Sequence, residues 1–240
     1  MQTTSTTNPP GLALPFVGRE KELARLNQLH AQRKHVLILG PAGVGKSALL
    51  ARLRQQLPLL LCPHSEHFGE ICESLEGELD LSAANLKLVQ RKKRLRQALA
   101  EAGKTVVFDG LGWTTPKLSS FLETVMARVP VWIATRSERS WNIGHFWLQL
   151  ARFERVELHP FHLPETQALV EAMVKRRMIP PDTRRIVEWL QRRSAGNPLV
   201  LRELFAELAN GHYDLSNPLA LRRLDLDRRI HEVFPVGGEL

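Results

Sequence analysis

The chain has 240 residues, of which 43% are hydrophobic, and a formal net charge of +8. This length and apolar content suit an α/β core with a small satellite domain. No apolar run approaches the length needed to span a membrane, and the opening MQTTSTTNPPG has no secretory-signal pattern and indicates a flexible arm.

Helices and strands are predicted to alternate between residues 19 and 158. Apolar periodicity predicts helices over 19–32, 46–57, 82–103, 117–129 and 141–151. Short apolar runs predict strands over 35–39, 58–62, 104–110 and 130–137, and a further short strand is predicted at roughly 155–158. Alternation of this kind is typical of a parallel sheet sandwiched by helices.

The pattern changes after about residue 161, where only helices are predicted. Three amphipathic segments, 163–178, 181–196 and 198–211, are separated by Pro and Gly turns. We therefore expect a small all-α lid, followed by mixed, short structure in the last thirty residues. The predicted divisions are an arm over 1–13, a core over 14–160, the lid over 161–211 and an extension over 212–240.

A glycine-rich turn lies between the first predicted strand and the helix that follows it. Its sequence fits the phosphate-binding pattern G-x-x-x-x-G-K-[ST] without a gap. The residues predicted to bind the nucleotide there are Gly40, Pro41, Ala42, Gly43, Val44, Gly45, Lys46, Ser47 and Ala48. Backbone N–H groups and the helix N-terminus favour the phosphates. Lys46 can reach the β- and γ-phosphates, and the Ser47 hydroxyl can bind Mg²⁺.

A second metal-binding group is expected at the end of another buried strand. Asp109, in VVFDG, occupies such a position, although an Asp there can also simply cap a turn. Gly110 follows it, where many P-loop ATPases carry the acid that activates water. Hydrolysis of ATP is therefore expected to be slow, or to use a base from elsewhere, for which Glu138 is a weak candidate.

Several motifs in order resemble the AAA+ superfamily, and within it the STAND and archaeal-type ATPases. They are FVGRE (16–20), GPAGVGKS (40–47), VVFD (106–109), WIATRS (132–137) and GNP (196–198). The resemblance implies an ASCE-type P-loop NTPase fold with a helical lid, using ATP or ADP and Mg²⁺.

The resemblance also implies roles for single residues. Val17, Gly18 and Arg19 would line the adenine and ribose side, and Pro198 would pack against the base. Thr135 and Arg136 would form a sensor near the γ-phosphate, although a strand-end Thr-Arg pair can also be a plain cap and a surface charge.

LARFERVEL (150–158) is similar to the AAA+ segment that carries an arginine finger. Such a guanidinium stabilises transition-state charge in a neighbour's ATP site. Arg152 is the first candidate and Arg155 the second, with a solvated arginine as the equal alternative. A finger acting in trans requires a homo-oligomer in the ATP state.

Basic clusters recur along the chain. RKKRLR (91–96) holds five cations, and arginine pairs begin at 176, 184, 192, 222 and 228. A charge run usually forms a solvated face, but the repetition favours phosphate contacts with duplex DNA. Without interleaved aromatic residues, any such binding is expected to be weakly sequence-specific and strongly salt-dependent.

Several functions remain open from the sequence. The first is an ATP-dependent oligomeric switch acting on a separate effector protein, with no membrane involved. The second is an AAA+ ATPase that assembles on duplex DNA as a loader or transposition regulator. A nucleotide-binding scaffold without turnover remains open because no acid follows Asp109. A small-molecule kinase is disfavoured, since the FVGRE box, the Thr-Arg sensor and the lid have no evident use in it.

The two cysteines, Cys62 and Cys72, lack the spacing of a metal site. This favours a reduced compartment and therefore a cytoplasmic protein.

Overall fold

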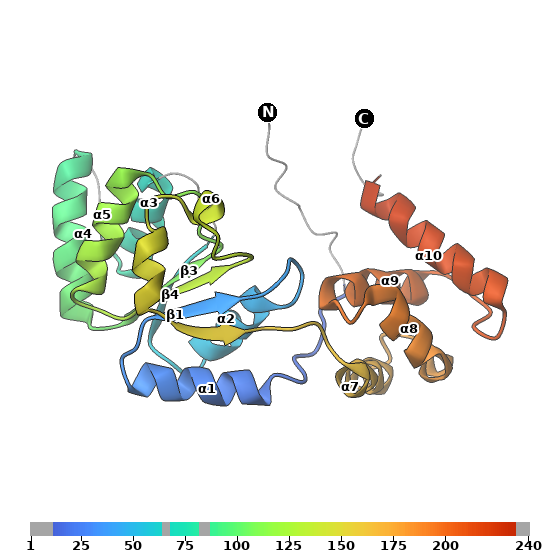
Figure 1. Cartoon of the computed structure of the whole chain (residues 1–240). Coiled ribbons are helices and arrows are strands. Elements are labelled where there is room, and N and C mark those ends of the chain that lie inside the picture. The colour runs from blue at the N-terminus through green and yellow to red at the C-terminus, as the bar shows by residue number, and fades with distance from the viewer. Residues whose placement is uncertain (1–11, 64–67, 82–86, 234–240) are drawn as a thin grey trace. The chain divides into compact units, whose positions relative to one another are not determined.

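A computed structural model describes residues 12–63, 68–81 and 87–233 (Figure 1). The chain separates into two compact units. One comprises residues 19–159, and the other comprises residues 160–233 together with 12–18. The first contains a sheet and the second is helical.

The sheet unit is built on five parallel strands. They are β1 (Val36–Leu39), β2 (Leu59–Cys62), β3 (Thr105–Asp109), β4 (Val131–Thr135) and β5 (Glu154–Glu157). Their order is β2-β3-β4-β1-β5, so β4 lies between β1 and β3. In a parallel sheet all carboxyl ends meet at one edge. The register places Leu39 level with Thr135, and Asp109 level with Ala134.

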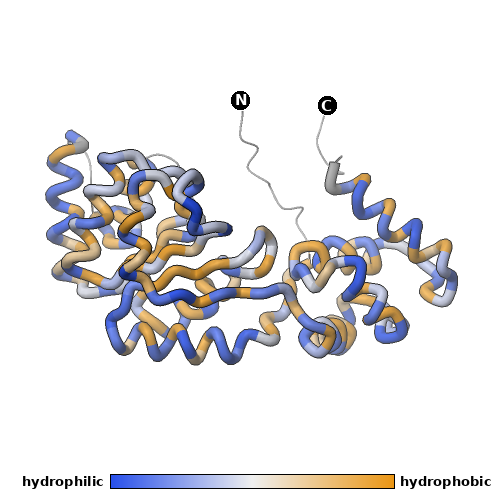
Figure 2. Tube along the Cα trace, viewed as in Figure 1, coloured by the Kyte–Doolittle hydropathy of each residue, from blue (hydrophilic) through white to orange (hydrophobic). Residues whose placement is uncertain are grey.

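Helices cover both faces of this sheet. The helices α1 (Glu20–Ala31) and α2 (Lys46–Arg54) share a buried cluster with Ile38 and Trp132. The opposite cluster joins Leu37 and Ile133 to α3 (Phe68–Glu78), α4 (Leu88–Ala102) and α5 (Pro116–Met126). Neighbouring strand residues thus enter different clusters, as the alternation of side chains along a strand requires. Figure 2 shows most strands as hydrophobic, the edge strand β5 as largely hydrophilic and α1 as alternating. The predicted α/β fold is confirmed.

Some elements differ from the sequence prediction. The helix α3 was not predicted, although Ile71, Cys72 and Leu75 give it a buried stripe. The predicted start of the long helix near residue 82 lies outside the described residues, and its described part is closed by Gly103 at φ +61°. The single helical segment predicted over 141–151 is wrong. It consists of α6 (Ser140–Ile143) and the 3-10 helix η1 (Trp147–Arg152), because Gly144 ends α6 at φ +73°.

The helical unit contains the three predicted amphipathic segments. They form α7 (Leu163–Lys175), the 3-10 helix η2 (Pro181–Ile186) with α8 (Val187–Ser194), and α9 (Pro198–Asn210). The prediction of mixed, short structure at the end is wrong, because α10 (Pro218–Val233) follows. Leu224 of this helix is fully buried in the core of the helical unit, and this packing stabilises α10.

The segment before α1 packs with the helical unit. Leu12, Leu14 and Val17 lie against the same core cluster as α7 and α9. Gly18 has φ +67°, and a Cβ there would lie 2.6 Å from Cγ of Glu165. The sequence prediction began the core at residue 14, whereas the structure begins the sheet unit at Arg19. Among the described helices, we find none that is both long and apolar enough to cross a bilayer.

Candidate nucleotide site

The glycine-rich turn connects β1 to α2 at the carboxyl edge of the sheet. Gly43 and Gly45 adopt φ of +75° and +100°, which residues with a side chain rarely adopt. A Cβ on Gly40 would lie 2.7 Å from the carbonyl oxygen of Leu158 and 2.9 Å from Cγ1 of Val44. A Cβ on Gly45 would meet nothing within 4 Å, so this side of the turn is open. The turn therefore has the backbone form that a phosphate cradle needs.

The side chain of Arg19 holds the phosphate turn in place through hydrogen bonds to backbone carbonyl oxygens. Its side chain is buried and donates hydrogen bonds to the carbonyl oxygens of Val44, at 3.1 Å, and His159, at 2.7 Å. It also pairs with Glu22 at 2.9 Å. The guanidinium thus joins the start of α1, the turn and the end of the sheet unit. This structural contact is visible only in the fold, because nothing in the sequence links Arg19 to Val44.

Lys46, Asp109 and Arg136 lie together at the carboxyl edge. The Lys46 ammonium donates to the carbonyl oxygens of Gly40, at 2.6 Å, and Pro41, at 2.9 Å. Burial lowers the pKa of Lys46, Arg136 lowers it further, and Asp109 opposes the shift. These charges come from three separate segments of the chain. The strand order brings the predicted lysine, acid and sensor arginine close enough for their charges to interact.

Ser47 and Asp109 provide ligands that suit Mg²⁺. Ser47 is exposed in the first turn of α2, and Asp109 is half-buried at the end of β3. The Asp109 carboxylate makes no hydrogen bond to another described residue, so its oxygens are available. Nowhere in 12–63, 68–81 and 87–233 do three or more His, Cys, Asp or Glu side chains gather as an all-protein metal cage. A hydroxyl and one carboxylate fit Mg²⁺ that takes its other ligands from phosphates and water.

The residues after β4 are engaged with one another. Thr135 is buried, and its hydroxyl donates to the carbonyl oxygen of Ser137 at 3.2 Å. Glu138, the weak candidate for the base, accepts a 2.8 Å bond from Arg155. Both contacts hold the turn that carries Arg136. The sensor role of Thr135 remains a prediction.

Arg152 lies at the opposite edge of the sheet from Lys46. It ends η1, just before β5, and is exposed. Its charge adds to burial in lowering the pKa of His35, the residue before β1. Along β1, the distance from His35 to Gly40 is about 16 Å. Arg152 is therefore on the side of its own sheet where the phosphate turn is absent.

Other predicted binding residues belong to the helical unit. Val17 is half-buried against that unit's core, and Gly18 lies against Glu165. Pro198 is buried in the first turn of α9, where the Asn197 side chain accepts the N–H of Leu199 at 3.0 Å. Their contacts with a nucleotide remain predictions.

Many arginines of the predicted basic clusters are paired with acids. Arg91 makes a bidentate pair with the buried Glu76, with N–O distances between 2.5 and 3.1 Å. Three more arginines, Arg193, Arg228 and Arg229, surround the buried Asp225. Arg184 pairs with Glu171. Arg176, Arg177, Arg192 and Arg222 are exposed. The clusters are thus partly internal, which weakens the argument for a continuous phosphate-binding surface.

The sequence matches the AAA ATPase domain family over residues 15–133. No curated protein matched the chain in sequence. The family's matched region includes the phosphate turn and Asp109, and it ends within β4, before Thr135 and Arg136.

Solved structures with the same fold were found. The Orc1 protein of Aeropyrum pernix in complex with DNA is 16% identical, with a TM-score of 0.65 over 92% of this chain and 66% of that one. A Walker-type ATPase of Pyrococcus abyssi is 18% identical, with a TM-score of 0.63 over 90% and 73%. A STAND protein with a tetratricopeptide repeat sensor, from Pyrococcus horikoshii, is 19% identical, with a TM-score of 0.51 over 90% and 33%. The chain thus spans about two thirds of Orc1 and one third of the STAND protein.

Proposed function

We propose that this chain is an ATP-dependent switch that assembles into oligomers and regulates a separate effector protein. Its AAA ATPase domain, matched at residues 15–133, makes it an AAA+ P-loop protein. The observation that carries the proposal is the meeting of Lys46, Asp109 and Arg136 beside the open phosphate turn. Two cations and one carboxylate there match the charges of a nucleoside triphosphate with its metal.

Each side chain has a distinct task in binding ATP. Lys46 would exchange its bonds to Gly40 and Pro41 for the β- and γ-phosphates. The amides of the turn and the N-terminus of α2 would hold the phosphate oxygens. Ser47 and Asp109 would hold Mg²⁺, which neutralises phosphate charge when it is bound. Arg136 would face the γ-phosphate and distinguish ATP from ADP.

We propose that hydrolysis of ATP is slow. Gly110, which follows Asp109, has no side chain that takes a proton from water. The nearest acid in the turn after β4, Glu138, is bound to Arg155. Without a positioned base the attacking water loses a contribution of about 10²–10⁴ in rate. A long-lived ATP state suits a switch.

Arg152 is proposed as the finger that acts on a neighbouring protomer. It is exposed at the edge of the sheet away from its own phosphate turn, and no ion pair with another described residue holds it. Arg155, the second candidate, is already paired with Glu138. A cation at that edge can serve a neighbour's site and not its own, so assembly would complete each site.

The test is size-exclusion light scattering with ADP, with a non-hydrolysable ATP analogue, and with the analogue plus duplex DNA. Assembly with the analogue alone, lost in Lys46→Ala and Arg152→Ala and kept in Arg25→Ala, supports the switch. Arg25→Ala is the control because it removes an exposed arginine that has no proposed role in the nucleotide site. A monomer under every condition overturns the oligomeric switch.

A second candidate is an AAA+ ATPase that assembles on duplex DNA. Exposed arginines at 176, 177, 192 and 222 of the helical unit favour it, and the similar Orc1 protein was solved with DNA. In the same experiment, assembly that requires DNA and fades between about 50 and 200 mM salt would favour this candidate over the first.

A further inference from the structure

Three of the five tryptophans are exposed and lie on neighbouring segments of the sheet unit. Trp113, Trp141 and Trp147 have exposed fractions of 56%, 65% and 45%, whereas Trp132 is fully buried. They come from the loop after β3, from α6 and from the start of η1. We call these three side chains the indole platform.

Backbone contacts hold the parts of the platform together. Thr114 forms a bridge with Gly144, and its amide and hydroxyl both donate to the carbonyl oxygen of Ile143. The amide of Phe146 donates back to the Thr114 hydroxyl at 2.9 Å. Thr114 is fully buried, so this tie excludes water. The loop after β3 is therefore fixed to the segment that carries the other two indoles.

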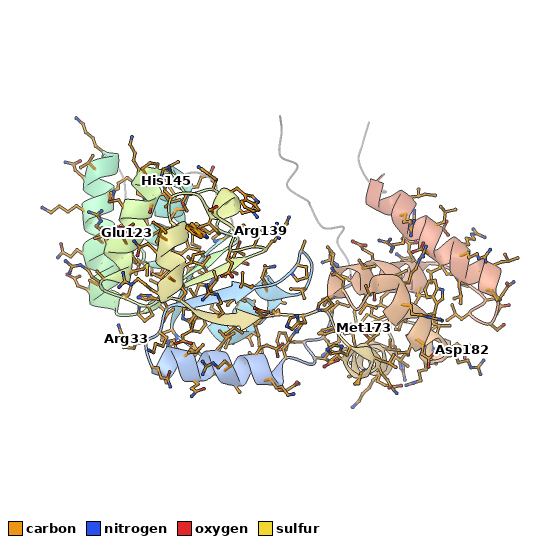
Figure 3. All side chains as sticks on the ribbon, viewed as in Figure 1. Arg33, Glu123, Arg139, His145, Met173 and Asp182 are labelled. Atoms are coloured by element: carbon orange, nitrogen blue, oxygen red, sulfur yellow. The ribbon has the colours of Figure 1, made fainter. Side chains whose placement is uncertain are left out.

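The absence of a side chain at Gly144 lets Trp113 pack against this segment. A Cβ on Gly144 would be 3.0 Å from the Trp113 ring. The ring centroids of Trp113 and His145 are 6.4 Å apart, nearly perpendicular. The Arg139 guanidinium lies 5.2 Å from the Trp141 ring centroid. Figure 3 shows Arg139 and His145 at the same end of the unit as α6.

The platform exposes a sizeable aromatic area to water. An indole side chain has about 200 Å² of surface, so three at roughly half exposure leave about 300 Å² in contact with water. A patch of that size on a soluble protein often marks a binding surface. Leu111, Ile143 and Phe146 of the same segments are buried in the core, so the three indoles are not needed to fill it.

The charges around the platform suit an anion. The segment 136–148 carries Arg136 and Arg139 against one acid, Glu138, and that acid is paired with Arg155. The segment 110–117, which includes the start of α5, adds Lys117 and no acid. Flat aromatic faces next to cations suit a ligand that offers both bases and phosphates. A duplex hides its base faces, whereas a single strand exposes them.

We propose that the indole platform binds single-stranded nucleic acid, with bases stacked on the indoles and phosphates near Arg139. It lies close to the candidate ATP site, because Trp113 follows Asp109 by four residues and is at most about 14 Å from it along the chain. The proposal does not depend on the ATPase function, since binding is expected without nucleotide.

The experiment measures fluorescence anisotropy of labelled oligo-dT and oligo-rU of about 20 nucleotides, beside a duplex of equal length, without ATP. We expect both single strands to bind more tightly than the duplex, and their relative affinities to show whether DNA or RNA is preferred. Trp141→Ala is expected to weaken binding about tenfold, and Trp141→Phe to retain most of it, because a ring face remains. Trp141 is the choice because it is the most exposed of the three, so its removal leaves the fold intact.

Leu148→Ala is the matched control. Leu148 is 72% exposed in the same segment, but it has no ring face on which a base can stack. Its replacement is expected to leave the affinity for single strands unchanged. The proposal is overturned if single strands do not bind, if the duplex binds equally well, or if Leu148→Ala weakens binding as much as Trp141→Ala. Displacement of the strand by an equal concentration of free AMP would also overturn it, since the platform would then stack any lone base.

Discussion

At the scale of single residues, Arg19 and the glycines decide the shape of the phosphate turn. The sequence motif predicts the glycines well, because a positive φ and a close backbone approach each require them. It does not predict that Arg19 holds the carbonyl oxygen of Val44 from behind. Such a bond joins positions 25 residues apart, and no local pattern encodes it.

Replacing Arg19 is expected to weaken both the fold and nucleotide binding. Arg19→Ala removes two charge-assisted bonds to carbonyl oxygens, so we expect a loss of about 3 kcal/mol in the stability of the sheet unit. The turn would lose its support, and ATP affinity is expected to fall. Thermal unfolding with and without ATP measures both effects. Arg25→Ala, which removes an exposed arginine with a 3.4 Å pair, is the control and is expected to change neither.

Gly196 has an equally strict requirement in the helical unit. Its φ is +71°, and an added Cβ would overlap the carbonyl oxygen of Phe161. Gly196→Ala is therefore expected to lower the stability of this unit by about 3 kcal/mol or more. The control is Gly77→Ala in α3, where nothing lies within 4 Å and a small gain of about 0.5–1 kcal/mol is expected. Equal melting temperatures for the two variants would contradict the assignment.

At the scale of elements, the sequence predicts the strands better than the helices. All five predicted strands are present, and their ends differ from the prediction by at most two residues. Buried parallel strands are short apolar runs, which are easily recognised. The helix α10 was missed because its apolar residues are interrupted by Arg and Asp. Its packing depends on the burial of Leu224 and on the pair between Asp225 and Arg193 of α8, which no local pattern encodes.

The charge cluster around Asp225 attaches α10 to the rest of the unit. Asp225 is buried, Arg193 of α8 donates to it, and Arg229 lies 3.0 Å away. Arg228 of the same helix bonds to Glu203 of α9 at 2.8 Å. The hydrogen bond from Arg193, supported by the nearby guanidinium charges, lowers the pKa of Asp225. Folding therefore favours the ionised form.

This cluster predicts a loss of stability in acid. A carboxyl group whose pKa is lower in the folded state stabilises the fold above its unfolded value of about 3.9, and that contribution disappears as the pH falls through the folded pKa. Asp225→Asn removes the charge that pairs with Arg193 and Arg229, and both of these arginine side chains are partly exposed, so we expect a loss of about 2 kcal/mol at pH 7. The variant is also expected to lose less additional stability below pH 4 than the parent. Denaturant unfolding across pH measures both, and parallel pH curves would contradict the prediction.

At the scale of the whole molecule, the sequence predicts the AAA+ resemblance, which the match over residues 15–133 confirms. It does not predict the indole platform, since Trp113 is far in sequence from Trp141 and Trp147 and only the bridge at Thr114 brings them together. The assignment to the STAND group, the effector and the finger remain predictions, because they concern contacts with other molecules.

Mixing two inactive variants tests the proposed sharing of sites. Lys46→Ala lacks the phosphate lysine but keeps Arg152, and Arg152→Ala has the reverse. If Arg152 acts on a neighbour, a mixture is expected to recover part of the ATPase rate, because some interfaces combine an intact turn with an intact finger. Phosphate release from each variant and from the equimolar mixture measures this. A mixture no faster than its components contradicts a finger in trans.

The position of Arg152 on the edge of the sheet away from Lys46 also gives the proposed assembly a direction. Protomers that join one edge to the other must follow each other head to tail, which is a heterologous contact. An open row then has two unlike ends, one presenting an unused arginine and the other a phosphate turn without a neighbour's arginine. At the first end, the unused arginine can reach into the phosphate turn of a new protomer. At the second end, the phosphate turn can accept the arginine of a new protomer. A row of n protomers would hold n − 1 complete sites, whereas a closed ring would hold n, so the rate per protomer would report whether the assembly closes.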